Sequence, residues 1–234
     1  MLIIAHRGAS RTEPENTLRA FCRAVELGCP WIECDVRLTR DGVPVIIHDA
    51  TANRTTDGRG RISGITYKAL RKFNAGKNEK VPSLQETLEF AQAHNINLVL
   101  EIKDLRALAP SLRLLKQNSS PPKKGEASEG VSRNVIISSF SPFLIIRAKR
   151  LLSTLTTALI IENPLRDWVK TAKKSHADMV HVFAPLATKK KIAAAHQAGL
   201  QIWAWTVNDT RIEKRLLKKG VDGIFTDYPE QFMT

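Results

Sequence analysis

Residues 31–49 read Trp31-Ile-Glu-Cys-Asp-Val-Arg-Leu-Thr-Arg-Asp-Gly-Val-Pro-Val-Ile-Ile-His-Asp49, and this stretch decides the fold. It consists of two runs rich in apolar and β-branched residues, with Asp41-Gly42 between them. An Asp-Gly pair in that setting is typical of the two-residue turn of a β-hairpin. The stretch therefore predicts a strand, a tight turn and a returning strand.

The same stretch carries two acids and a histidine that the hairpin would bring together. A two-residue turn places Asp35 opposite His48 in the antiparallel ladder. Because side chains alternate along a strand, Glu33 and Asp35 share one face, which His48 joins. Cys34 points to the other face, where we expect it to pack under a helix. Taken alone, the two acids could also be a solvated pair at a strand end.

Outside this stretch the chain alternates between strand-like and helix-like segments. Strands are expected at residues 2–6, 97–103, 135–140, 157–162, 179–184, 201–207 and 221–226. Helices are expected at about 17–27, 83–94, 105–116, 142–152, 164–175, 187–198 and 209–219. Strands that alternate with helices over 234 residues predict an α/β fold, the (β/α)8 or TIM barrel. A doubly wound open sheet is the structural alternative.

We expect a single domain over residues 1–234 with one small insertion in the barrel. Residues 50–80, which follow the hairpin, are polar and rich in glycine, and predict a flap with a short helix near residues 67–73. Residues 118–130 contain few apolar residues and many turn formers, which predicts a mobile loop. Asn16 is the expected N-cap of the first helix.

The composition limits the partners and the compartment. A net charge of +13 favours an anionic partner, either a phosphorylated small-molecule substrate or, weakly, an anionic membrane surface. Aromatic residues make up only 6% of the chain and no nucleic-acid-binding motif is present, so we expect no nucleic-acid partner. The 3 cysteines have no C-x-x-C spacing and indicate neither a disulfide scaffold nor a zinc site. Without a signal peptide or a long apolar run, the protein is expected to be cytoplasmic; its oligomeric state is left open.

Polar residues stand where the predicted strands end, which is where a (β/α)8 barrel gathers its catalytic residues. These residues are His6, Arg7, Glu33, Asp35, Glu101, Lys103 and Trp205. Alternation puts Glu101 and Lys103 on one face of their strand. Glu33, Asp35 and Glu101 carry hard oxygen ligands of the kind that bind Ca²⁺ or Mg²⁺, and without a cation they would repel one another.

This combination of residues suits the cleavage of a phosphodiester. A divalent cation, Arg7 and Lys103 would offset the charge of the phosphate and of its transition state. His6 and His48, on opposite sides, would share the proton transfers. Singly, each residue also has a structural explanation, such as an ion pair between Lys103 and Glu101. No P-loop, nucleophile elbow or dinucleotide-binding motif supports other chemistry.

Short motifs that follow one another in a fixed order cover nearly the whole chain. They are Ala5-His-Arg-Gly8, Pro14-Glu-Asn-Thr17, Glu33-Cys-Asp-Val36, Asp41-Gly-Val-Pro-Val45, His48-Asp49, Arg54-Thr-Thr56 with Gly58 and Gly60, Glu101-Ile-Lys103, Ser139-Phe140, Trp205-Thr-Val-Asn208 and Gly223-Ile-Phe-Thr-Asp-Tyr-Pro229. Each is weak alone, but the ordered set resembles the glycerophosphodiester phosphodiesterase family. The resemblance implies a metal-dependent (β/α)8 barrel with a small insertion. It also implies hydrolysis of glycerophosphodiesters, such as glycerophosphocholine and glycerophosphoethanolamine, to sn-glycerol 3-phosphate and an alcohol.

By position, the resemblance implies roles for the charged residues at the strand ends. Glu33, Asp35 and Glu101 would bind the divalent cation, either Ca²⁺ or Mg²⁺. Arg7 and Lys103 would hold the phosphate. The lysine-rich surface and residues 118–130 depart from the family pattern, and they bear on partners more than on the reaction.

The remaining implied roles concern proton transfer and the glycerol pocket. His6 would be the general base and His48 the general acid, with His48 close to the cation, and Trp205 would line the glycerol pocket. A lysophospholipase D-type phosphodiesterase that acts on lysophospholipids at a membrane is the alternative, and an exposed apolar rim at the barrel mouth would favour it. A barrel that only binds a phosphorylated ligand would not need two histidines with three acids.

Overall fold

The computed structural model describes residues 1–118, 135–164 and 167–233, and their parallel strands close into a ring. The strands are β1 (Leu2–His6), β2 (Trp31–Leu38), β3 (Pro44–Ile46), β4 (Asn97–Ile102), β5 (Val135–Ser139), β6 (Thr156–Ile161), β7 (Met179–Phe183), β8 (Gln201–Trp205) and β9 (Gly223–Thr226). β1 pairs in parallel with both β2 and β9, which closes the ring, whereas β3 is antiparallel to β2 at its edge. Closure confirms the predicted barrel and excludes the open sheet.

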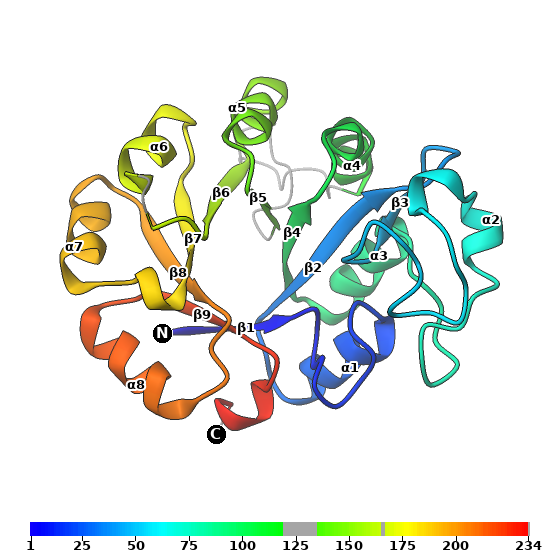
Figure 1. Cartoon of the computed structure of the whole chain (residues 1–234), viewed down its shortest axis with the longest axis horizontal. Helices are drawn as coiled ribbons and strands as arrows, with labels where there is room; N and C mark the ends of the chain where they lie inside the picture. The colour runs from blue at the N-terminus through cyan, green and yellow to red at the C-terminus, as the bar shows by residue number, and fades with distance from the viewer. Residues whose placement is uncertain (119–134, 165–166, 234) are drawn as a thin grey trace, which may run out of the picture.

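Helices alternate with these strands and surround them. They are α1 (Leu18–Glu26), α2 (Tyr67–Leu70), α3 (Leu84–His94), α4 (Leu105–Gln117), α5 (Pro142–Leu151), α6 (Trp168–Lys174), α7 (Lys189–Gln197) and α8 (Thr210–Lys219). Figure 1 shows them around the ring of strands, except for α2, which lies farther out than α3. None of the helices in the described ranges is long and apolar enough to cross a membrane.

The strands bury apolar side chains on both faces, as a ring covered by helices requires. One cluster fills the interior of the ring: Ile4, Val99, Ile136, Ala158, Met179, Trp203 and Phe225. The outward face packs on the helices, and Cys34 is buried there with Phe21 of α1 and Leu88 of α3. This position confirms the predicted orientation of Cys34, and it implies that Glu33 and Asp35 point inward.

The hairpin between β2 and β3 has a three-residue turn, so the predicted register was wrong by one residue. The third turn residue is Gly42, which has a φ of 80°, as is usual in three-residue hairpin loops. Asp35 therefore lies opposite Ile47, whose amide donates to the Asp35 carbonyl at 2.9 Å. His48 lies beyond the end of the ladder, where alternation no longer decides which way a side chain points.

The first helix also begins one residue later than the predicted cap. Its N-cap is Thr17, whose hydroxyl accepts a hydrogen bond from the amide of Ala20 at 3.2 Å. Asn16 has a φ of 59° and is buried, so the prediction that it caps the helix was wrong. Its side chain turns toward β2 instead.

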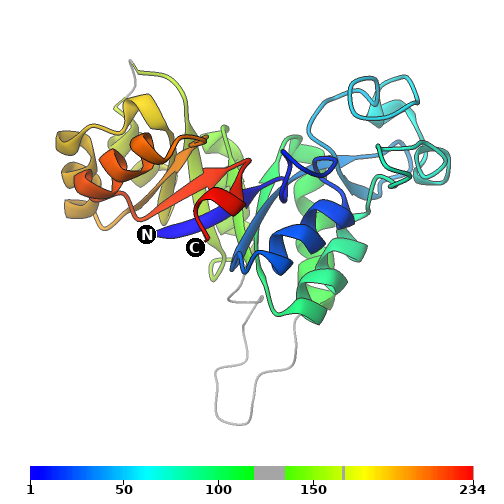
Figure 2. The same ribbon diagram turned by 90° about the horizontal axis from the view of Figure 1, so that it is seen from below.

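Residues 50–80, which we call the flap, follow β3 and lie outside the ring. The flap contains a short 3-10 helix (Ile62–Gly64) and α2, and an apolar cluster attaches it to β3: Val45, Ile47, Ala52, Ile62, Leu70, Ala75 and Val81. Figure 2 shows it (cyan) projecting from one end of the barrel. The loop predicted at 118–130 lies, apart from Asn118, outside the described residues, and the single domain over 1–234 stays a prediction.

Candidate active site

Three acids from two neighbouring strands meet at the mouth of the barrel, the end at which the parallel strands finish. Glu33 and Asp35 lie on β2, and Glu101 lies on β4, where the register pairs it with Asp35. All three are buried, and their ligand oxygens lie within 4.8 Å of one another. The structure thus brings together the three residues that the sequence predicted as an acid cluster.

The electrostatics of this acid cluster fit a cation. Burial raises the pKa of Glu33 to about 8, and the charge of Asp35 adds to the rise. Burial and Asp35 likewise raise the pKa of Glu101. Burial acts in the same direction on Asp35, but Lys103 and Arg7 outweigh it and lower the pKa of Asp35 to about 2. Three hard oxygen donors buried this close together suit Ca²⁺ or Mg²⁺.

Two cationic side chains line the acid cluster. The Lys103 ammonium lies 2.9 Å from Oδ1 of Asp35 and 2.5 Å from Oε1 of Glu101. Arg7 Nε lies 3.2 Å from Oδ2 of Asp35, and the Arg7 amide donates to Oε2 of Glu33 at 3.0 Å. Both side chains are mostly buried, so an anion that reached the cluster would meet two partly desolvated cations. Their predicted role as phosphate contacts stays a prediction.

Asn16 orients one acid of the cluster, a role that the sequence did not predict. Its Nδ2 donates to Oδ2 of Asp35 at 2.8 Å, and its Oδ1 accepts from the Asp35 amide at 3.3 Å. The side chain is therefore held on both ends, which fixes the rotamer of Asp35. The motif Pro14-Glu-Asn-Thr17 contained a signal for this role. Because Thr17 caps the helix, Asn16 is not needed as a cap and could serve another purpose.

His6 ends β1 and pairs in register with Glu33. Its Nδ1 lies 2.6 Å from Oδ1 of Asp227, and its Nε2 lies 3.9 Å from Oε2 of Glu33. Burial lowers the pKa of His6, but the hydrogen bond to Asp227 and the charge of Glu33 outweigh burial and raise it overall. Asp227 in turn accepts hydrogen bonds from Asn208 at 2.7 Å and Ser10 at 3.3 Å.

His48 reaches the site from the flap side. Its Nδ1 lies 2.7 Å from Oδ1 of Asp49. Burial lowers the pKa of His48 and outweighs the charge of Asp35 and the hydrogen bond to Asp49, which both raise it. The prediction that His48 lies opposite Asp35 in the ladder was wrong, yet the imidazole still lies within electrostatic reach of Asp35.

Trp205 ends β8 and belongs to an aromatic wall on the far side of the mouth, formed by Phe140, Phe183 and Trp205. The Trp205 indole N–H donates to the carbonyl of His181 at 3.0 Å. The ring of Trp205 lies 5.8 Å from that of Phe140 and 5.4 Å from that of Phe183. Lys103 Nζ lies 5.9 Å from the centre of the Phe140 ring, so the wall adjoins the acid cluster.

The sequence did not predict the carboxylates that support the two histidines. Asp227 follows β9 and Asp49 follows His48 directly, so both belong to quoted motifs, but a contact across the barrel cannot be read from a local pattern. The link from Asp49 to Arg54 and Glu15 was missed for the same reason.

A barrel mouth that joins a candidate cation site to two histidines, each supported by a carboxylate, is suited to phosphodiester hydrolysis. The fold and the site therefore define the class of protein as the (β/α)8-barrel phosphodiesterases. Residues 6–231 match the model of the Glycerophosphoryl diester phosphodiesterase family, and the chain belongs to this family. This confirms the fold class and the enzyme class that the sequence predicted.

Relatives and solved structures agree over the full length. A glycerophosphodiester phosphodiesterase of Caldanaerobacter subterraneus is 34% identical over 238 residues, which cover 98% of this chain and 95% of the relative. A phosphodiesterase of Oleispira antarctica, solved in complex with the product sn-glycerol-3-phosphate, superimposes with a TM-score of 0.89 at 30% identity and covers 99% of this chain and 94% of its own. A glycerophosphodiester phosphodiesterase of Agrobacterium tumefaciens gives a TM-score of 0.84 at 26% identity, with 100% and 99% covered.

Proposed function

We propose that the protein hydrolyses glycerophosphodiesters, such as glycerophosphocholine and glycerophosphoethanolamine, to sn-glycerol 3-phosphate and an alcohol. The observation that carries the proposal is the convergence of the acid cluster with two histidines whose Nδ1 atoms each bind a carboxylate. Ligand binding needs no such pair, whereas proton transfer does. The Oleispira antarctica relative, with its bound product, supports the choice of product.

The phosphate would bind between the acid cluster and the two cations beside it. When bound to Glu33, Asp35 and Glu101, a divalent cation supplies Lewis acidity toward a phosphate oxygen. Arg7 and Lys103 hold the phosphate in place, and their charges offset the negative charge that grows in the transition state. Both Ca²⁺ and Mg²⁺ fit these oxygen donors.

In this proposal His6 acts as the base, which takes the proton of the hydroxyl that attacks the phosphorus, either that of water or the 2-hydroxyl of glycerol, and His48 acts as the acid. A hydrogen bond from Nδ1 to Asp227 leaves Nε2 of His6 free to accept a proton. His48 gives its proton to the leaving alkoxide. The surrounding side chains raise the pKa of His6, whereas burial lowers that of His48, which is the reverse of what the two roles favour. Neutralisation of Glu33 by a cation removes one of the charges that raise the pKa of His6.

The test of this function is the release of glycerol 3-phosphate from glycerophosphocholine before and after treatment with EDTA. Release is expected to stop with EDTA and to return when Ca²⁺ or Mg²⁺ is restored, and the better cation identifies the metal. Release that survives chelation would remove the cation from the mechanism. If the folded, cation-loaded protein releases nothing from any glycerophosphodiester, the proposal is refuted.

A second candidate, action on lysophospholipids at an anionic membrane, is favoured by an exposed apolar rim at the barrel mouth. Phe183 ends β7, Leu105, Phe140 and Phe143 follow the ends of β4 and β5, and each of the four is at least 39% exposed. Exposed apolar side chains gathered at one end of a protein are typical of an interaction surface. If the substrate is a soluble glycerophosphodiester, the aromatic wall would instead present Trp205 to the carbon atoms of glycerol.

The charge of the flap supports the same candidate. Residues 50–80 contain eight lysines and arginines and only two acids. Basic segments next to an apolar surface attract anionic headgroups. Co-sedimentation with phosphatidylglycerol vesicles at low salt is expected for this candidate, together with release of choline from lysophosphatidylcholine. Sedimentation at background, or hydrolysis of soluble diesters alone, would reject it. For the hydrolase of soluble glycerophosphodiesters we also propose a cytoplasmic location.

A further inference from the structure

Arg54 of the flap joins two carboxylates that belong to different parts of the site. Its Nε donates to Oδ2 of Asp49 at 2.7 Å, and its Nη1 donates to Oε2 of Glu15 at 2.7 Å. Its Nη2 donates to both, at 3.1 Å to Asp49 and 2.8 Å to Glu15. The guanidinium thus binds each carboxylate through two N–H groups, a planar geometry that a lysine cannot reproduce.

Each of these carboxylates holds a residue of the proposed reaction. Oδ1 of Asp49 lies 2.7 Å from Nδ1 of His48, and Oε1 of Glu15 accepts from Nη1 of Arg7 at 2.9 Å. A continuous chain of hydrogen bonds therefore leads from the imidazole of His48 through Arg54 to the guanidinium of Arg7. The proton-transfer residue and the phosphate-holding residue share one anchor.

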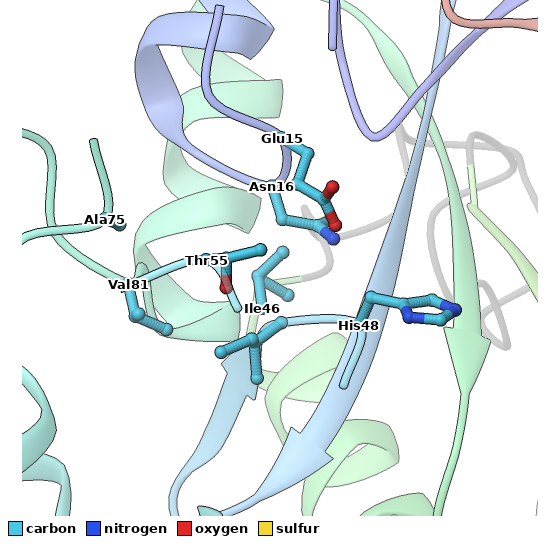
Figure 3. A pocket seen from close by; sticks show the side chains of 8 residues that line it. Glu15, Asn16, Ile46, His48, Thr55, Ala75 and Val81 are labelled. Carbon is cyan, nitrogen blue, oxygen red and sulfur yellow. The ribbon is translucent and has the colours of Figure 1, made fainter. Parts of the chain in front are cut away.

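Apolar packing does not provide this anchor. A small hollow beside His48, partly open to solvent, is lined by residues of both the barrel and the flap. Ile46, Ile47, Ala75 and Val81 line its apolar part, and Figure 3 shows the imidazole of His48 directed away from it. The apolar contacts of the flap thus hold the backbone near His48, whereas the hydrogen bond to Asp49 holds the ring.

We propose that Arg54 is a positioning residue that fixes His48 through Asp49 and Arg7 through Glu15, so that the flap sets the geometry of proton transfer. The proposal rests on the proposed function, because it concerns the orientation of a histidine in that reaction. With Arg54 in place, both oxygens of Asp49 are bound and its carboxylate cannot rotate away from Nδ1 of His48. The imidazole then keeps its proton on Nδ1 and presents Nε2 to the mouth.

The flap offers a matched control in Arg71. Its Nη2 lies 3.1 Å from Oε1 of Glu86 in α3, and its guanidinium lies 5.9 Å from the centre of the Tyr67 ring. Arg71 therefore also ties the flap to the barrel through an ion pair, but it has no link to a histidine. A general need for flap arginines would affect Arg54 and Arg71 alike.

The first experiment compares Arg54→Met, Asp49→Asn, His48→Ala and Arg71→Met on two substrates. One is glycerophosphocholine, and the other is a glycerophosphodiester with p-nitrophenol as the leaving group, which departs without a proton. Arg54→Met is expected to lower kcat on glycerophosphocholine by about 10-fold, below the range for loss of the acid–base group itself. The ratio of its losses on the two substrates should match that of Asp49→Asn, and His48→Ala should differ in the same direction with a larger ratio. The Arg54→Met/Asp49→Asn double variant should lose no more than the larger single loss, and Arg71→Met should retain activity.

Full activity in Arg54→Met, a substrate ratio unlike that of Asp49→Asn, or losses that multiply in the double variant would each overturn the proposal. A second measurement does not depend on turnover. The ¹⁵N shifts of the His48 imidazole should report one tautomer in the wild-type protein and in Arg71→Met, and a mixture in Arg54→Met. An unchanged tautomer in folded Arg54→Met would overturn the proposal even if the wild-type protein hydrolysed no glycerophosphodiester, an outcome that would refute only the proposed function.

Discussion

The two histidines reach the same mouth with different kinds of support. His6 belongs to the barrel itself: it ends β1, and its carboxylate partner Asp227 follows β9, the neighbouring strand in the ring. His48 lies beyond the end of β3, and its partner Asp49 is held by Arg54 of the flap. The pKa shifts of the two imidazoles have opposite signs, since that of His6 is raised and that of His48 is lowered.

This difference shows how one barrel can hold two similar groups in unlike environments. On the barrel side, strand register fixes the positions, and neutral donors such as Asn208 and Ser10 complete the support. On the flap side, a single arginine does so with charge-assisted hydrogen bonds. The insertion is therefore part of the proposed catalytic apparatus, and it holds the carboxylate partner of His48 directly.

The largest expected effect concerns the acid cluster, which adjoins both histidines. Glu33→Gln keeps the shape of the side chain and removes one charged ligand. Loss of an outer partner of a metal site costs roughly 10- to 100-fold in affinity or activity, and loss of a ligand should cost at least about 100-fold. Calorimetric titration with Ca²⁺ and Mg²⁺ and the rate of glycerol 3-phosphate release would measure it. A cation affinity close to that of the wild type would show that Glu33 is not a ligand of the cation.

The same residue makes the stability of the cation-free protein depend on pH. The pKa of Glu33 is about 8 in the folded chain against an ordinary value of 4.5, so the folded state favours the protonated acid. The stabilisation is complete below a pH of about 4.5 and is lost as the pH rises through about 8. The Tm after EDTA treatment is expected to fall over that range and to recover with the cation. Glu33→Gln should show a smaller fall, because Glu101 still has a raised pKa. A Tm of the wild-type protein that does not change with pH would contradict the shift.

Replacement of the histidines themselves is expected to have the next largest effect. His6→Ala and His48→Ala should each lower kcat by about 10²-fold or more, the usual contribution of general acid–base catalysis. If His48 is the acid, its loss shrinks on a substrate with a p-nitrophenol leaving group, whereas the loss in His6→Ala does not. A loss that shrinks in His6→Ala and not in His48→Ala would make His6 the acid and His48 the base. Activity close to that of the wild type in either variant would remove that histidine from the mechanism.

Replacement of the carboxylates that support the histidines is expected to have a smaller effect, and its pH dependence should distinguish His6 from His48. Asp227→Asn and Asp49→Asn should each cost about 10-fold in kcat, less than loss of the imidazole. Because each carboxylate raises the pKa of its histidine, each substitution should lower that pKa. With His6 as base, Asp227→Asn moves the acidic limb of the pH–rate profile to lower pH. With His48 as acid, Asp49→Asn moves the alkaline limb in the same direction. A shift of the same limb in both variants would contradict the division of roles.

What the sequence could predict also differs between the regular strands of the barrel and the segments outside them. Alternation and parallel register placed Glu33, Asp35 and Glu101 together, because those residues lie within regular strands. The hairpin register failed, since Asp41-Gly42 is compatible with a two-residue and a three-residue turn. His48 was nevertheless assigned to the mouth, both from that register and from the family motif His48-Asp49.

Contacts between distant segments were beyond the sequence. Asp227 lies 221 positions from His6, and Arg54 lies 39 positions from Glu15, so no local pattern relates them. Asn16 was read as a helix cap because asparagine is common there. Only the folded backbone, which places Asn16 in the left-handed region, directs its amide to Asp35.

The smallest expected effect tests whether the barrel side is supported redundantly. Asn208 donates to Oδ2 of Asp227 at 2.7 Å, the position that Arg54 takes at Asp49, but it is neutral and Ser10 remains as a second donor. A neutral hydrogen bond contributes about 0.5–1.5 kcal/mol, so Asn208→Ala should lower kcat only about 3-fold. Steady-state kinetics beside Arg54→Met would measure the difference. If Asn208→Ala lost as much as Arg54→Met, the support of His6 would rest on a single partner too, and the two sides would differ only in where their carboxylates come from.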